Sequence, residues 1–164
     1  MSRVLGELLY GKHAHSDPLV CVNVAAEEAG RRPASLPHSI WQLVCHMNYW
    51  MDYEQGRIAG TPPPYPERAA LSWPDVAPAD GGAWRRERDR FAALLAQLAR
   101  HATSPVAELA RPISASHESE AQHAASLEAV LWQTLVHNSY HIGQVVVVRQ
   151  ALGRWPPASG SDTW

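Results

Sequence analysis

Two histidines near the C-terminal end of the chain, His137 and His141, have the spacing of a metal-binding pair. They are four residues apart in a stretch that reads as one long helix, and four helical steps return a side chain to nearly the same face. Two imidazoles placed in this way can each give one ring nitrogen to a single transition metal ion. The pair alone has a second interpretation, in which both rings lie in the core and form hydrogen bonds with other helices.

A third histidine, His46, lies in the other strongly helical segment, among core-type neighbours such as Leu43 and Trp50. A polar ring among apolar side chains needs a partner. Two ligands from one helix and one from a neighbour would make a facial three-histidine site with open coordination positions, which are typical of catalytic metals. The sequence therefore predicts one divalent ion bound by three histidine side chains: His46, His137 and His141.

The predicted ligand set contains no carboxylate, because no acidic residue stands one helical turn from any of the three histidines. Three neutral imidazoles, completed by water or substrate, suit zinc, nickel or a similar ion. There is no H-E-x-x-H motif, so no catalytic residue is identified. The other six of the nine histidines lie in polar stretches, in loops or near helix ends, and need no special role: His13, His15, His38, His101, His117 and His123.

The helix that carries the histidine pair is predicted to extend from Leu127 to Leu152, with Ser126 as its N-cap and Gly153 at its end. The run Val145 to Val148 taken alone favours a strand, because β-branched residues do so. It continues the helical pattern on both sides, however, and we therefore assign it to the helix.

The helix that carries His46 is predicted from Ile40 to Ile58, and Ser39 with Gln42 has the pattern of a capping box at its start. A long connection follows, from Thr61 to Pro78, whose six prolines exclude regular helix. It also carries aromatic and aliphatic side chains, so we expect it to be ordered and packed along the bundle.

Two further segments complete the predicted fold. A helix from Gly81 to His101 begins at Asp80, and an irregular stretch from Ser104 to Ala125 follows it. The N-terminal part reads as one interrupted helix from Arg3 to Ala29, restarted at Ser16. The chain is thus predicted to be a single all-α domain over residues 1–164, a four-helix bundle with a long crossover between its second and third helices.

Composition restricts the function classes. The net charge is −2 over 164 residues, which argues against nucleic acid or an anionic membrane as a partner. The longest aliphatic run is far too short to span a membrane. Cys21 and Cys45 are too few for a disulfide framework, and the first ten residues lack a signal sequence, so we expect a cytoplasmic protein with free thiols.

The residues around the three histidines resemble the DinB-like (YfiT-like) superfamily of metal-binding four-helix bundles. One matching stretch covers Pro37 to Trp50 and contains the pattern Ser-Ile-Trp-Gln-Leu-x-x-His. The other covers Leu135 to Gln144, with the pattern His-x-x-x-His-x-Gly-Gln, and continues from Arg149 to Pro157. The combination is more specific than either pattern alone, and the order of the elements matches over essentially the whole chain.

This resemblance implies a metal held by the matching positions His46, His137 and His141, a long crossover, and a homodimer. Some members of the superfamily are thiol S-transferases that use a low-molecular-weight bacterial thiol such as bacillithiol or mycothiol, and a related branch includes a mycothiol-dependent maleylpyruvate isomerase. A thiol and an electrophile are therefore the expected substrates. The same site chemistry also permits a metal-dependent hydrolase, and a non-catalytic metal-binding stress-response protein is the third possibility.

Tyr53 and Gln144 are the candidate substrate contacts, because each shares a helix face with a predicted ligand. Tyr53 is seven residues beyond His46, and Gln144 is three residues beyond His141. Their ordinary interpretation is that of polar groups in helix contacts. Three tryptophans outside the helical stripes are candidates for the dimer interface, because leftover aromatic residues often mark interfaces: Trp73, Trp155 and Trp164.

Overall fold

Helices are the main regular structure in the computed structural model, which describes residues 2–74, 80–113, 125–158 and 160. The described part of the chain contains no strand beyond an isolated bridge between Pro112 and Ser126. The all-α prediction is therefore confirmed. The helices are α1 (Ser2–Leu9), α2 (Pro18–Cys21), α3 (Ala26–Gly30), α4 (Ile40–Ile58), the 3-10 helix η1 (Ala69–Ser72), α5 (Gly81–Ala102), α6 (Val106–Leu109) and α8 (Leu127–Ala151).

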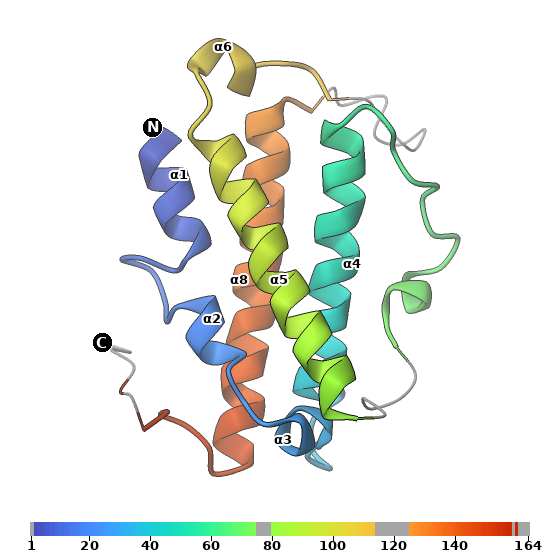
Figure 1. The fold of residues 1–164 in the computed structure, drawn as a ribbon, viewed down its shortest axis with the longest axis vertical. Coiled ribbons are helices and arrows are strands. Elements are labelled where there is room, and N and C mark those ends of the chain that lie inside the picture. The colour runs from blue at the N-terminus through green and yellow to red at the C-terminus, as the bar shows by residue number, and fades with distance from the viewer. Residues whose placement is uncertain (1, 75–79, 114–124, 159, 161–164) are drawn as a thin grey trace.

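The long helices α4, α5 and α8 pack together with α1 around a shared interior (Figure 1). α4 contacts both α5 and α8, and α1 contacts α5 and α8. Figure 1 shows α4 and α5 pointing in the same direction, whereas α1 and α8 point in the opposite one. The connection from α4 therefore returns along the outside of the bundle before α5 begins. This arrangement places α4 and α8, which carry the three histidines of interest, side by side.

The starts of the three long helices match the capping residues predicted from the sequence. Ser39 and Gln42 form a complete capping box: the Ser39 hydroxyl accepts a hydrogen bond from the Gln42 amide at 3.3 Å, and the Ser39 amide donates to Gln42 Oε1 at 3.1 Å. Asp80 and Ser126 accept in the same way at the starts of α5 and α8. The valine run is helical, and Gly153 follows α8 with a φ of +68°.

The prediction of one interrupted helix at the N-terminus was wrong. Residues 2–30 form three separate short helices, α1, α2 and α3. Pro18 occupies the first turn of α2, so the cap falls on Asp17 rather than Ser16, and the Asp17 carboxylate accepts from the Leu19 amide at 2.8 Å. Gly11 makes the turn after α1 with a φ of +75°, where an added Cβ would lie 2.5 Å from the carbonyl oxygen of His15.

The connection after α4 is ordered over its described part, residues 61–74, as expected from its apolar content. It contains η1, and the side-chain amide of Gln42 donates to the carbonyl oxygen of Pro74 at 3.1 Å. Residues 75–79 lie outside the described part. The second irregular stretch contains α6, and its residues 114–124 are likewise outside it.

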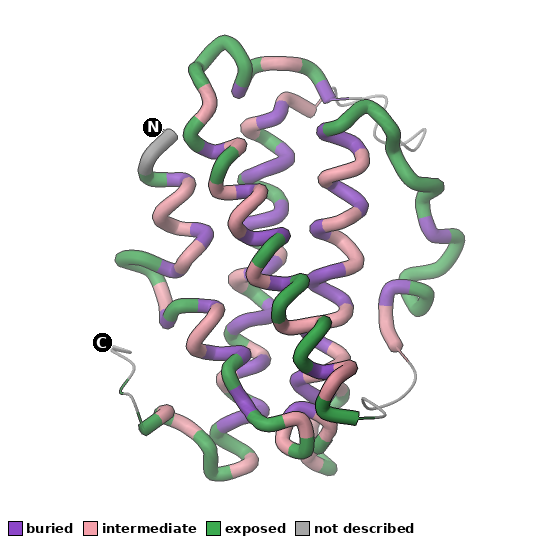
Figure 2. The backbone as a smooth tube through the Cα atoms, in the orientation of Figure 1, coloured by how far each residue is buried: buried purple, intermediate pink, exposed green. Residues whose placement is uncertain are grey.

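Buried apolar side chains from all four bundle helices form one cluster, and buried positions recur along each long helix (Figure 2). Two polar anchors fasten the N-terminal segment to this bundle: the Trp84 indole donates to the Val24 carbonyl at 2.8 Å, and Arg149 donates to the carbonyls of Val20 and Cys21. None of the helices described here has the length and apolar character needed to cross a membrane.

Candidate metal centre

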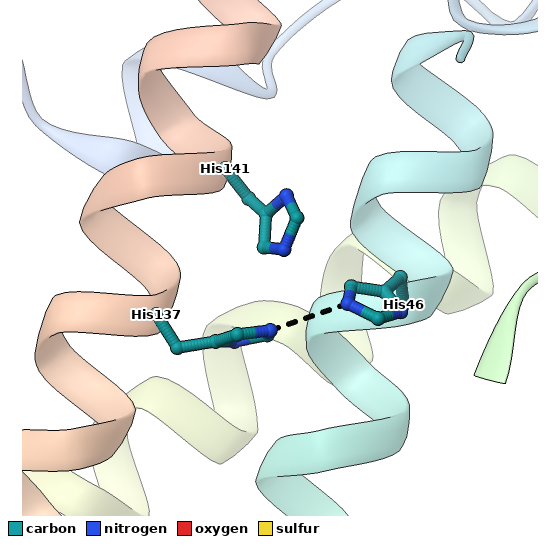
Figure 3. Close-up of side chains that lie close together, drawn as sticks. All are labelled: His46, His137 and His141. Carbon is teal, nitrogen blue, oxygen red and sulfur yellow. Dashed lines mark hydrogen bonds between the residues drawn. The ribbon is translucent and has the colours of Figure 1, made fainter. Parts of the chain in front are cut away.

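Three histidine side chains meet between α4 and α8 (Figure 3). His46 comes from α4, and His137 and His141 come from successive turns of α8. One ring nitrogen of each lies within 4.8 Å of the others, and Nε2 of His46 is 3.2 Å from Nε2 of His137. Two of the rings are buried and His137 is half-buried. The structure thus brings together the three residues that the sequence predicted as ligands.

The hydrogen bonds of His46 determine which of its nitrogens carries hydrogen. Nδ1 of His46 is 2.9 Å from the hydroxyl oxygen of Ser72, and that hydroxyl donates its own hydrogen to the carbonyl oxygen of Ala69 at 2.7 Å. Since the hydroxyl hydrogen is already used, Nδ1 of His46 must be the donor to Ser72. Nε2 of the neutral ring therefore keeps a free lone pair, directed toward His137.

His141 is held in the same tautomer by a residue of its own helix. Nδ1 of His141 lies 2.7 Å from Oε1 of Gln144, an oxygen that can only accept. Nε2 of His141 is therefore also free to coordinate. A hydrogen bond on the second nitrogen, which fixes the tautomer and ring direction, is the usual support of a metal-binding histidine.

These fixed tautomers fit a bound cation. Two bare ring nitrogens 3.2 Å apart repel unless an ion lies between them or His137 carries a hydrogen on Nε2. Metal–nitrogen distances of about 2.0–2.1 Å require ligand nitrogens about 3–3.5 Å apart, which the His46–His137 pair already satisfies. Histidine, cysteine and acidic side chains can all bind metals. Among the described residues, the group of such side chains with the spacing of metal ligands consists of these three histidines, without a carboxylate.

All three rings are kept neutral at physiological pH. Burial lowers the pKa of His46 to about 3, and the neighbouring His141 and His137 add to this shift. Burial, followed by His141, lowers the pKa of His137 to about 4, and burial lowers the pKa of His141 as well. Neutral imidazole is the form that binds a metal, so the ligands need not lose a hydrogen first.

A stack of three rings supports His46 from the side of the outer connection. The Trp73 indole lies parallel to the His46 ring with their centroids 3.8 Å apart, and parallel to the His38 ring at 3.9 Å. Trp73 thus packs within its own chain, and its place in a dimer interface stays a prediction. Trp155 also packs within its own chain, against Arg149 at 5.0 Å, and Trp164 lies outside the described residues.

One cavity opens onto the histidine cluster, and a second lies beside residues that contact it. Cavity 1 has a volume of about 330 Å³ and reaches His137; it is lined by Trp50, Tyr53, Glu54, Tyr65, Gln133, Thr134 and His137. Cavity 2 has a volume of about 240 Å³; it is lined by Leu36, Pro37, His38, Leu43, Tyr140, Gly143, Gln144, Val147 and Val148. Cavity 2 is lined by none of the three histidines and borders the cluster through Gln144, which accepts a hydrogen bond from His141.

The structure places the two candidate contact residues in different cavities. Tyr53 lines cavity 1 and is nearly buried, with its ring edge-on to Trp50, whereas Gln144 lines cavity 2. Sequence reasoning missed Ser72, Trp73 and His38 as neighbours of the cluster. The apolar content of the connection indicated that it packs on the bundle, but no local pattern placed Ser72 against His46.

The comparisons with known proteins agree with this description. Residues 19–145 match the family model of the DinB superfamily, and this span includes all three histidines. No curated protein and no solved structure matches the chain.

Proposed function

We propose that this chain, which belongs to the DinB superfamily, binds one divalent transition metal ion on His46, His137 and His141 and transfers a low-molecular-weight thiol onto an electrophilic carbon. Zinc and nickel are the proposed ions, because three neutral imidazoles suit both. The bound ion would supply Lewis acidity that lowers the pKa of a thiol placed beside it. In the transfer itself, sulfur forms a bond to carbon, the leaving group departs with its bonding electrons, and the thiol hydrogen goes to solvent.

The observation that supports this proposal is a cavity that opens onto His137, with a second cavity that borders Gln144, the hydrogen-bond partner of His141. A transferase must hold two organic substrates at once, whereas a hydrolase needs room for one organic substrate and water. Cavity 1 reaches His137, and cavity 2 reaches Gln144, which contacts His141. Each is large enough for part of a small organic molecule, although both are at or below the lower end of typical ligand-pocket sizes.

The walls of cavity 1 favour an apolar or aromatic group. Trp50, Tyr53 and Tyr65 contribute rings that contact one another with centroids 5.3–5.9 Å apart. The one carboxylate in the wall belongs to Glu54, which accepts from Arg57 at 3.0 Å. Tyr53 is proposed to contact the substrate in cavity 1, and Gln144 to contact the substrate in cavity 2 while it orients His141.

The chain's own thiols are poor candidates for the nucleophile, so the thiol must come from outside. Burial raises the pKa of Cys21 to about 12, and burial together with Glu87 raises the pKa of Cys45 to about 12. Neither cysteine lines cavity 1 or cavity 2. Small thiols are kept reduced in the cytoplasm, which we propose as the compartment of action.

The test is thiol consumption by protein loaded with zinc or nickel. Bacillithiol, mycothiol and glutathione are each supplied with a monochlorobimane-type alkylating acceptor, and the rate is compared with that of the His137→Ala variant. Faster thiol loss in the wild type supports the transferase. If the wild type hydrolyses activated esters without consuming thiol, the hydrolase replaces it. If it binds metal but does neither, the non-catalytic binding protein replaces both.

A further inference from the structure

Cavity 1 has a corner built from three aromatic rings, each of which contacts the other two. Trp50 lies edge-on to Tyr53, with ring centroids 5.3 Å apart and an angle of 78° between the planes. Tyr65 closes the triangle, at 5.9 Å and 78° from Tyr53 and at 5.8 Å and 50° from Trp50. Because the planes are steeply inclined to one another, the rings form the walls of a corner instead of a flat stack. We call these three residues the aromatic corner: Trp50, Tyr53 and Tyr65.

The aromatic corner has a buried floor and an exposed rim. Trp50 and Tyr53 lie three residues apart on α4, so both project from one side of that helix, and Tyr53 is buried. Tyr65 comes from the outer connection and is 43% exposed. Rings that served only to pack α4 against the connection would be filled in by other side chains, whereas these bound a cavity of about 330 Å³. The aromatic corner is therefore open to a ligand from solvent.

A carboxylate stands beside the aromatic corner in the wall of cavity 1. Glu54 is buried, and both of its oxygens accept from Nη1 of Arg57, at 3.0 and 3.2 Å. Arg57 is 2% exposed and is not among the described residues that line the cavity. The ion pair therefore presents its negative member to the cavity and keeps its positive member behind the wall. An anionic ligand would be repelled by this carboxylate, and the buried setting strengthens the repulsion.

The rest of the described lining also suits a cation. It consists of Gln133, Thr134 and His137, and it includes neither Lys nor Arg. Thr134 donates its hydroxyl hydrogen to the Val130 carbonyl at 2.9 Å, so its oxygen can only accept from a ligand. Ring faces, a carboxylate and acceptor oxygens thus surround the cavity, without a positively charged side chain among the described residues of its wall.

We propose that cavity 1 binds a substituted ammonium group, with its nitrogen over the aromatic corner and beside Glu54. The face of an aromatic ring carries negative charge density, and a cation within about 6 Å of the ring centroid is attracted to it. Three rings with centroids 5.3–5.9 Å apart can all meet this condition for a single cation. The alkyl groups on the nitrogen supply the apolar surface that the rings favour, whereas bare ammonium keeps its hydration.

This inference rests on the proposed function in one respect, namely that cavity 1 holds a substrate of the metal site. Glu54 lies eight residues beyond His46 on α4, about 12 Å along the helix axis. Cavity 1 also reaches His137. An ammonium group beside Glu54 would thus stay away from the charge of a bound divalent ion, while a short chain carries the reacting atom toward His137. The substrate class is therefore one in which several bonds separate a substituted ammonium group from the reacting atom.

The first test titrates metal-free protein with choline and with its neutral isostere 3,3-dimethylbutan-1-ol, in which carbon replaces the charged nitrogen. The chemical shifts of the tryptophan indole N–H groups report binding, and Trp50→Phe identifies the signal of Trp50. Sodium chloride keeps the ionic strength constant. Choline is expected to shift the Trp50 signal and to bind about 3–30-fold more tightly than the isostere. Equal affinity for the two probes, or no binding of choline, overturns the proposal.

The second test removes one ring of the aromatic corner. Tyr65→Leu should weaken choline binding about 3–30-fold, whereas Tyr65→Phe, which keeps the ring, should retain most of the affinity. Trp132→Leu is the matched control, because Trp132 is 42% exposed on α8 and is not among the residues that line cavity 1. Equal choline affinity in Tyr65→Leu and Trp132→Leu overturns the proposal.

The third test removes the charge of the wall and keeps its shape. Glu54→Gln should lower the affinity for choline toward that of the isostere and leave the affinity for the isostere unchanged. Because Glu54 also binds the buried Arg57, circular dichroism checks that this variant folds, and the Tyr65 variants decide the question if it does not. An unchanged preference for choline in folded Glu54→Gln overturns the role of the carboxylate.

The outcomes separate this inference from the proposed transferase, because every titration uses metal-free protein. Choline binding without thiol consumption by the metal-loaded protein would support the ammonium site and overturn the transferase. Thiol consumption without choline binding would overturn the ammonium site alone.

Discussion

His46 and His141 belong to the same cluster, yet the protein holds them by different means. His141 donates to Gln144, which lies three residues further along the same helix. His46 donates to Ser72, which lies 26 residues away in the outer connection, and stacks on the adjacent Trp73. One ligand is thus oriented by its own helix, the other by a segment that must first fold back along the bundle. The metal affinity should therefore depend on whether that connection is folded against the bundle.

The largest effect is expected when a ligand is removed. His141→Ala should abolish stoichiometric metal, because two imidazoles without a third partner bind a divalent ion far more weakly. Elemental analysis of untagged protein measures this directly. His101→Ala is the matched control, since His101 lies on α5 and contacts Gln55 at 3.3 Å. Equal metal content in the two variants would refute the three-histidine assignment.

The next effect separates the two kinds of support. Ser72→Ala and Gln144→Ala each remove the acceptor that fixes one ligand, and each should weaken metal affinity about 10–100-fold. Competition with a chromogenic chelator measures the affinity. Only Ser72→Ala should also increase proteolytic cleavage within residues 61–74 of the metal-free protein. Equal protection in the two variants would show that His46 does not hold the connection.

A smaller effect is expected from pH in the metal-free protein. The pKa values of His46 and His137 lie near 3 and 4 in the folded state, against 6.5 for an ordinary histidine. The unfolded chain therefore binds more protons between these values, and the free energy of unfolding should fall as the pH drops from about 6.5 toward 4. Urea unfolding at pH 7.5 and 5 measures the loss. His137→Gln should reduce this pH dependence; an unchanged slope would contradict the assignment.

The smallest effects concern the helix starts. Ser39→Ala and Ser126→Ala each remove an N-cap, at a cost of about 1 kcal/mol in the free energy of unfolding. Ser39→Ala should cost more, because Ser39 is buried and its box partner Gln42 also binds the Pro74 carbonyl. Thermal unfolding of the two variants tests the order. A larger loss of stability for Ser126→Ala would show that the hydrogen bond from Gln42 to the Pro74 carbonyl contributes little.

The features that could be predicted from the sequence are those that depend on residues close to one another in the chain. The i, i+4 spacing of His137 and His141, the Ser39–Gln42 box and the stop at Gly153 all follow from local geometry, and the structure has each of them. The approach of Ser72 to His46 depends on how the proline-rich connection folds back, which no local pattern encodes. The predicted N-terminal helix from Arg3 to Ala29 was wrong for a related reason. With Pro18 in its first turn, α2 is capped by Asp17, and the segment after it packs on the bundle instead of continuing the helix.

The stacking of Trp73 on His46 gives the protein an optical reporter of its own. An indole whose ring lies 3.8 Å from a ligand ring is within reach of any quencher that occupies the cluster. Paramagnetic nickel should therefore dim the emission of this fluorophore, whereas zinc, which has a filled d shell, should leave its intensity nearly intact. The difference between the spectra of the wild type and Trp73→Phe isolates this signal from that of the other tryptophans. The chain thus carries, without any label, a means of distinguishing its two proposed ions.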